Sequence, residues 1–181
     1  LALHGLGGGA YFFEGCAVRL ADTCHMVMLD LPGTGTSRVS STPTLTSWIA
    51  DLTDLLRWHA SGSTILLGHS LGTILALELW RAAPELIAGM VFVGGLPKPR
   101  GVICERLRQR RSRIAAGRAF YPGLGYEVAE GVLSPQTRRA QPECTASFAR
   151  LFHAQDAEGY LQSLDILLAA DAWDVVPTVG V

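Results

Sequence analysis

The sequence predicts an α/β fold built on a parallel sheet, and three observations support that prediction. Short apolar runs, typical of strands that are buried on both faces, occur at residues 1–4, 25–29, 64–67 and 89–93. Apolar side chains recur at helical spacing over residues 45–59, and an apolar helix signal over residues 71–83 stops before Pro84. Strand and helix signals that alternate along a chain favour parallel strands joined by helices.

The pattern changes near residue 97. A segment rich in proline and glycine over residues 97–101 is typical of a linker, and helical signals follow over residues 102–117, 144–154 and 157–170. No strand signal returns before Val175. We therefore predict an α/β core at residues 1–96, a helical cap at residues 97–172, and the start of a returning core strand at residues 173–181.

Both ends of the chain differ from ordinary termini. Position 1 is Leu and already belongs to a strand signal, and the apolar run that begins at Val175 continues to Val181. Chain termini usually lie in exposed, polar segments. We therefore expect a fragment of a longer reading frame, truncated at both ends.

The composition excludes several classes of protein. The 181 residues are 49% hydrophobic and 17% charged, with a formal net charge of −1, which excludes intrinsic disorder and a generally basic nucleic-acid binder. No apolar run reaches the roughly 18 residues that span a bilayer. The four cysteines are widely spaced, so we expect free, mostly buried thiols. We expect a cytoplasmic protein without metal, cofactor, nucleic-acid or membrane partners.

The strongest chemical signal is Gly68-His69-Ser70-Leu71-Gly72, which fits the pattern G-x-S-x-G. It lies between a predicted strand and a predicted helix, where this motif exposes a nucleophilic serine on a sharp turn. Glycines two residues to either side leave room for such a turn. The alternative is a serine that only caps the helix N-terminus. The position between strand and helix favours Ser70 as a nucleophile.

A glycine-rich turn follows the first predicted strand at His4-Gly5-Leu6-Gly7-Gly8-Gly9. Such a turn brings a backbone N–H towards the nucleophile, and we expect the N–H groups of Leu6 and Leu71 to stabilise an oxyanion. With Ala10 the same glycines also fit G-x-G-x-x-A, and Asp30 lies about where a dinucleotide-binding unit carries its ribose-binding acid. That alternative leaves the motif at residues 68–72 unexplained.

Three segments, in this order, resemble the α/β-hydrolase superfamily. They are His4-Gly5-Leu6-Gly7-Gly8, Asp30-Leu31-Pro32-Gly33-Thr34-Gly35-Thr36-Ser37 and Gly68-His69-Ser70-Leu71-Gly72. The likeness is greatest to lid-bearing serine esterases and lactonases, and it covers residues 1–95 closely and 155–181 loosely. It implies Ser70 as the nucleophile and Leu6 and Leu71 as oxyanion donors. It also implies His4 and Asp30 as structural positions beside the site. We expect His4, Gly5 and His69 to border the bound substrate.

The resemblance also implies an acid and a base that residues 1–181 do not supply. The family's order along the chain is Ser, then Asp or Glu, then His, and the acid follows the strand that begins near Val175. The five histidines fit structural roles better than the role of base. We therefore expect the acid and the base beyond Val181.

A basic segment marks the first cap helix. Eight basic residues lie between Lys98 and Arg118, against Glu105 alone. One interpretation is an exposed helix face. The other is a docking surface for an acidic substrate or carrier protein, similar to the basic cap of esterases that act on acyl-carrier-protein methyl esters. The candidate docking residues are Arg100, Arg106, Arg108, Arg110, Arg111 and Arg113.

These signals together predict a serine hydrolase that cleaves a carboxylic ester, thioester or lactone by acyl transfer through Ser70. Its expected substrate is a small-molecule ester or lactone. Two alternatives stay open at this point. One is a non-catalytic binding protein on the same fold, and the other is a peptidase of the same superfamily.

Overall fold

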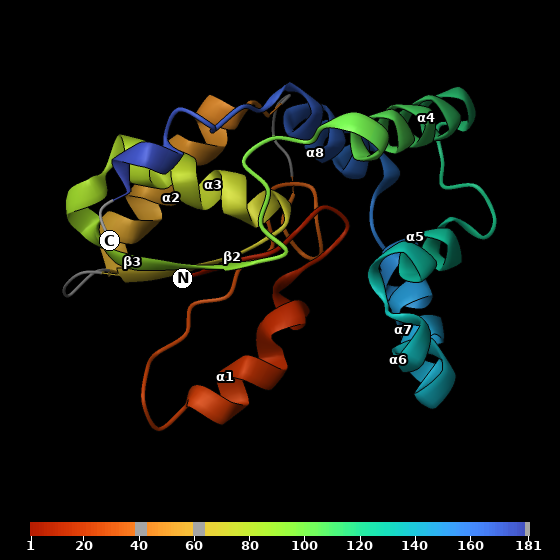
Figure 1. The fold of residues 1–181 in the computed structure, drawn as a ribbon, viewed down its shortest axis with the longest axis horizontal. Coiled ribbons are helices and arrows are strands. Elements are labelled where there is room, and N and C mark those ends of the chain that lie inside the picture. Colours follow the sequence, from red (N-terminus) through yellow and green to blue (C-terminus); the bar gives the residue numbers. More distant parts are fainter. Residues whose placement is uncertain (39–42, 60–63, 180–181) are drawn as a thin grey trace.

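The chain folds around a three-stranded parallel sheet, as predicted (Figure 1). A computed structural model describes residues 1–38, 43–59 and 64–179. The strands lie side by side in the order β1 (Ala2–Leu3), β2 (Thr64–His69) and β3 (Ile87–Val93). Figure 1 shows α2 (Leu45–His59) and α3 (Leu71–Ala82) on one side of the sheet and α1 (Glu14–Leu20) on the other.

The carboxyl ends of the three strands meet at one edge of the sheet. Leu3 of β1 is in register with Gly68 of β2, and Gly68 is in register with Phe92 of β3. The residues that follow these strands, His4 and Ser70 among them, are therefore brought together. This edge is where open parallel sheets bind their ligands.

Two predicted strands are wrong. Residues 25–29 form only an isolated bridge between Met28 and Ala2, because β1 has just two residues and offers little ladder to pair with. Where a returning strand was predicted, Val176–Thr178 form a 3₁₀ turn. Thr178 closes that turn by donating its N–H and its hydroxyl to the Val175 carbonyl, at 2.8 and 2.7 Å. Residues 180–181 lie outside the described part.

Five helices make up the region predicted as a cap. They are α4 (Gly101–Gly117), α5 (Leu124–Val132), α6 (Pro135–Ala140), α7 (Pro142–His153) and α8 (Ala157–Ala169). The sequence prediction found α4, α7 and α8 but missed α5 and α6, which are short. Ser134 followed by Pro135 is a sequence pattern typical of a helix start, and it could have identified α6. The Ser134 hydroxyl caps this helix by accepting from the Thr137 N–H at 3.0 Å.

The cysteines are free, as predicted, but they are not mostly buried. Cys16 is exposed because α1 buries none of its residues, and Cys24, which follows that helix, is exposed as well. Cys104 and Cys144 are half-buried. Within residues 1–38, 43–59 and 64–179, no helix combines the length and the apolar character that crossing a membrane requires.

Direct backbone contacts fix the turn between β2 and α3. A Cβ atom on Gly68 would lie 2.6 Å from the Gly72 carbonyl oxygen, and one on Gly72 would overlap the Leu3 carbonyl. Both glycines are therefore required by packing, whatever their backbone angles. The contact at Gly72 sets the first turn of α3 directly against the end of β1.

We predict that Gly72→Ala destabilises the fold by at least about 3 kcal/mol, because two backbone segments must separate to admit the methyl group. Gly117→Ala is the matched control, since a Cβ there meets no atom within 4 Å. It should leave the free energy of unfolding unchanged or raise it slightly. Urea unfolding monitored by circular dichroism measures both variants. Equal unfolding midpoints for Gly72→Ala and the wild type would contradict this packing argument.

Candidate active site

Ser70 occupies a strained backbone position between β2 and α3. Its φ of 52° and ψ of −113° lie in a region that residues other than glycine rarely adopt. The Ser70 N–H donates to the Val93 carbonyl at 3.2 Å, and the Ser70 carbonyl accepts from the Thr73 N–H at 2.9 Å. Its side chain makes no capping hydrogen bond to α3, which contradicts the interpretation of Ser70 as a helix cap.

The glycine-rich turn lies directly against Ser70. A Cβ atom on Gly5 would lie 3.0 Å from the Ser70 Cβ and 2.7 Å from Nδ1 of His69. The Gly8 N–H closes the turn on the Gly5 carbonyl at 2.9 Å. The two predicted oxyanion donors therefore lie on segments that flank the serine. Leu6 belongs to this turn, and Leu71 is the first residue of α3, where N–H groups lack intrahelical acceptors.

His4 holds the turn in place from inside the protein. Its side chain is only 1% exposed. Its Nε2 accepts from the Leu31 N–H at 3.0 Å, so the proton of the neutral ring is on Nδ1, which donates to the Gly5 carbonyl at 2.8 Å. Burial lowers the pKa of His4, and the hydrogen bond to Gly5 and the nearby Asp30 carboxylate only partly offset that effect.

Asp30 binds the same turn from its other end. Its carboxylate accepts from the Ala10 N–H at 2.9 Å, and from the N–H and the hydroxyl of Thr36 at 2.9 and 3.1 Å. Burial raises the pKa of Asp30, but these hydrogen bonds outweigh burial and hold the pKa below its usual value. Since the carboxylate already has three internal donors, it does not fit the ribose-binding acid of the dinucleotide alternative.

The remaining histidines do not contact the Ser70 hydroxyl. The ring of His69 stacks on Phe12 with 5.1 Å between centroids, and its buried Nδ1 has no hydrogen-bond partner among the described residues. Burial lowers the pKa of His69. His153 accepts from the Gly125 N–H at 3.2 Å. None of these rings is placed to take a proton from Ser70.

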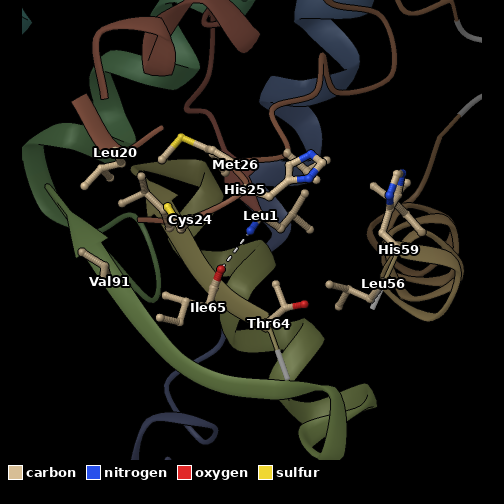
Figure 2. A pocket seen from close by; sticks show the side chains of 14 residues that line it. Leu1, Leu20, Cys24, His25, Met26, Leu56, His59, Thr64, Ile65 and Val91 are labelled. Atoms are coloured by element: carbon tan, nitrogen blue, oxygen red, sulfur yellow. Dashed lines mark hydrogen bonds between the residues drawn. The ribbon is translucent and has the colours of Figure 1, made fainter. Parts of the chain in front are cut away.

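His25 and His59 lie at the opposite end of the strands. They line a cavity of about 640 Å³ with Leu1, which precedes β1, and Thr64, which begins β2 (Figure 2). The N-terminal amine of Leu1 donates to the Ile65 carbonyl there, at 2.9 Å. Because Ser70 follows the carboxyl end of β2, this cavity is separate from the candidate site.

The cap helices contact the glycine-rich turn. The side chain of Gln155, between α7 and α8, donates from Nε2 to the Gly7 carbonyl at 2.5 Å. A Cβ on Gly7 would lie 2.7 Å from the ring of Phe152 and 3.2 Å from that of Tyr160. Gly159 at the start of α8 touches the backbone of Gly33. The glycine-rich turn is thus packed by the cap helices as well as by the core. The sequence did not predict these contacts between the cap and the turn.

The basic cap residues separate into two groups. Four of the six candidates have partners in the described part of the chain: Arg111 pairs with Asp165, Arg113 with Glu127, Arg110 binds the Tyr160 hydroxyl, and Arg100 lies over the Trp173 ring. Arg106 and Arg108 are exposed and form no ion pair with any described residue. Of the six candidates, these two form no side-chain hydrogen bond, ion pair or ring contact within the described residues.

The residues described by the structure gather no set of three His, Cys, Asp or Glu side chains that could hold a metal ion. The segments that flank Ser70 instead offer backbone N–H groups and the ring of His69. Backbone N–H groups beside the hydroxyl of the half-buried Ser70 are suited to binding a carbonyl oxygen that becomes negatively charged.

Comparisons with known proteins identify the family and the fold of the chain. A family model described as "Alpha/beta hydrolase family" matches residues 1–181. The chain is 30% identical over 176 residues to a pimeloyl-[acyl-carrier protein] methyl ester esterase of Chromobacterium violaceum, which covers 94% of this chain and 66% of that protein.

Solved structures share the fold at lower identity. A thermophilic esterase from Thermogutta terrifontis gives a TM-score of 0.82 at 20% identity, over 99% of this chain and 66% of that one. The enol-lactonase from Burkholderia xenovorans LB400 gives 0.80 at 18% identity, over 99% and 68%. The chain spans between about one third and two thirds of the length of the curated relatives it matches, from 36% to 66%.

The lowered pKa of His4 predicts a loss of stability in mild acid. The unfolded chain takes up a proton as the pH falls below 6.5, the ordinary pKa of histidine, whereas folded His4 does so only at lower pH. Stability should therefore be full above pH 6.5 and should decline below it. Urea midpoints between pH 8 and pH 5 measure this decline, which should be shallower in His4→Gln.

His69→Gln is measured alongside, because the lowered pKa of His69 acts in the same direction. A profile of His4→Gln that runs parallel to that of the wild type would contradict the assignment of His4 as the titrating group.

Proposed function

Because the chain belongs to the alpha/beta hydrolase family, whose model matches it from residue 1 to residue 181, we propose that it acts as a serine hydrolase with Ser70 as its nucleophile. The proposed substrates are small carboxylic esters, thioesters or lactones. The observation that carries this proposal is the strained turn at Ser70. The Ser70 hydroxyl makes no capping hydrogen bond to α3, and the residue lies beside the glycine-rich turn.

The geometry suits acyl transfer in two steps. The Ser70 Oγ attacks the carbonyl carbon while its proton passes to a base, and the carbonyl oxygen gains negative charge. The N–H groups of Leu6 and Leu71 donate to that oxygen. The leaving alcohol, thiol or ring oxygen departs with a proton. Water then attacks the acyl-enzyme, releases the acid and restores the Ser70 hydroxyl.

The residues around Ser70 take different parts in this proposal. Gly5 and His69 border the bound acyl group, since a Cβ on Gly5 would lie 3.0 Å from the Ser70 Cβ and 2.7 Å from Nδ1 of His69. His4 has no ring nitrogen free for a ligand, so we assign it to positioning the turn rather than to contacting substrate. No histidine among the described residues forms a hydrogen bond with the Ser70 hydroxyl, and we propose that the acid and the base are supplied from outside residues 1–181.

We predict that Ser70→Ala lowers the rate of ester hydrolysis at least about 10⁴-fold, because no other group can form the acyl-enzyme. The protein is expressed from the open reading frame that contains residues 1–181 and assayed with short-chain p-nitrophenyl esters, lactones and a peptide substrate. Ser112→Ala, at an exposed position of α4, is the control.

Equal rates for Ser70→Ala and the wild type would contradict the proposed nucleophile. Cleavage of the peptide in preference to every ester would favour a peptidase. Binding of esters without any turnover would favour a non-catalytic binding protein.

The free arginines of α4 favour a more specific partner. Arg106 and Arg108 are exposed and unpaired among the described residues, and one relative is named as an esterase for an acyl-carrier-protein ester. We propose that these two side chains meet acidic groups of a carrier protein that presents the acyl ester. Such contacts act mainly by speeding association.

We predict that Arg106→Glu combined with Arg108→Glu lowers kcat/KM for a carrier-linked ester about tenfold at low salt. Rising NaCl should lower the wild-type value towards that of the variant, because salt screens exposed charges. For a small neutral ester, kcat/KM should change neither with the double substitution nor with NaCl. An equal salt response of both substrates would contradict docking at this surface.

A further inference from the structure

Gln155 connects the cap to the glycine-rich turn through a single side chain. It lies between α7 and α8, and its backbone N–H donates to the Phe152 carbonyl at 3.3 Å. The next residue, Asp156, caps α8 by accepting from the Gly159 N–H at 2.6 Å. The half-buried side chain of Gln155 donates from Nε2 to the Gly7 carbonyl at 2.5 Å. The backbone of this residue is therefore fixed on the cap, while its amide binds the core.

Packing alone does not explain an amide at position 155. The Oε1 atom of Gln155 is buried and has no hydrogen-bond partner among the described residues. A buried acceptor without a donor costs free energy, and a leucine side chain would fill similar space without that cost. Within the described residues, the bond to Gly7 is the one hydrogen bond of this side chain. It is thus the contact that offsets the unpaired Oε1.

The bond at Gly7 begins a row of hydrogen-bonded peptide groups. The Gly7 carbonyl shares its peptide group with the Gly8 N–H, and that N–H donates to the Gly5 carbonyl at 2.9 Å. The Gly5 carbonyl shares its peptide group with the Leu6 N–H, which donates to no backbone group of the described residues. A trans peptide group is planar, and its N–H points away from its C=O. Each bond in the row therefore sets the direction of the next donor, from Gln155 to Leu6.

We propose that Gln155 is a positioning residue, which orients and polarises the Leu6 N–H through the two intervening peptide groups. Hydrogen bonds in a row strengthen one another, so a donor on the Gly7 carbonyl makes the later N–H groups better donors. A donor that is already fixed needs no reorganisation when the substrate carbonyl oxygen gains charge. The role of Leu6 as an oxyanion donor rests on the proposed function, but the anchoring of the turn by Gln155 does not.

The first experiment removes the donor from the protein expressed from the complete reading frame. Gln155→Leu should lower kcat for a short-chain p-nitrophenyl ester about tenfold with KM unchanged. This loss is smaller than the about 100-fold or more that follows when an oxyanion donor is itself removed.

Gln162→Leu is the matched control. Gln162 on α8 is also half-buried, donates from Nε2 to Glu158 at 3.4 Å, and has a buried Oε1 without a partner among the described residues. The two substitutions should change Tm by similarly small amounts, because each removes one hydrogen bond together with one unpaired acceptor. Equal kcat values for Gln155→Leu and Gln162→Leu would overturn the proposal.

The second experiment compares Gln155→Glu with the wild type across pH. Burial and the facing Gly7 carbonyl raise the pKa of the introduced carboxyl group above about 4.3, the ordinary value for Glu. Below that pKa the protonated group can donate to Gly7, and above it the carboxylate repels the carbonyl oxygen. The ratio of kcat in the variant to kcat in the wild type should therefore rise at least about threefold from pH 8 to pH 5. A constant ratio would overturn the proposal, even if Gln155→Leu does not fold.

Hydrogen exchange distinguishes this proposal from the proposed function. The Gly8 N–H should exchange at least about tenfold faster in Gln155→Leu than in the wild type, whereas Gln162→Leu should leave its rate unchanged. An unchanged rate in Gln155→Leu would overturn the anchoring of the turn. A wild-type protein that hydrolyses no ester would refute the proposed function, and faster exchange at Gly8 would then still support the anchor.

Discussion

The close backbone contact between Gly72 and the Leu3 carbonyl is the constraint on which the rest of the site depends. Any side chain at position 72 would push α3 away from β1 and from the turn that follows β1. Gly68 allows the chain to reverse within the next few residues. Ser70 is held at a positive φ between these two contacts, directly after the carboxyl end of β2. The strain at one residue is offset by packing at two glycines.

The glycine-rich turn is held from several directions at once. The buried His4 and the half-buried Asp30 bind it from one side, and Gln155 binds it from the cap, each through hydrogen bonds to backbone groups. An oxyanion site stabilises charge best when its donors are fixed before the reaction begins. The buried, neutral His4 and the ionised, internally bonded Asp30 are therefore most simply understood as parts of a rigid frame rather than as proton carriers.

The sequence was informative where function depends on local geometry. Glycines at fixed spacing around Ser70, and the run at residues 5–9, identified both turns, because only glycine fits such positions. Contacts between distant residues could not be predicted in this way. Nothing local marks the bond from Gln155 to Gly7 or from Arg110 to Tyr160, and α5 and α6 are too short for a clear periodic signal. The strand that was wrongly predicted at residues 25–29 likewise depended on a distant feature, the two-residue length of β1.

The most direct test of the account is the reactivity of Ser70 itself. The protein from the complete reading frame is treated with a fluorophosphonate, and the modified serine is located and timed by peptide mass spectrometry. The account predicts that Ser70 is labelled orders of magnitude faster than the exposed Ser112. Labelling of Ser70 no faster than of Ser112 would contradict it, since the strained turn would then present a serine that is not a nucleophile.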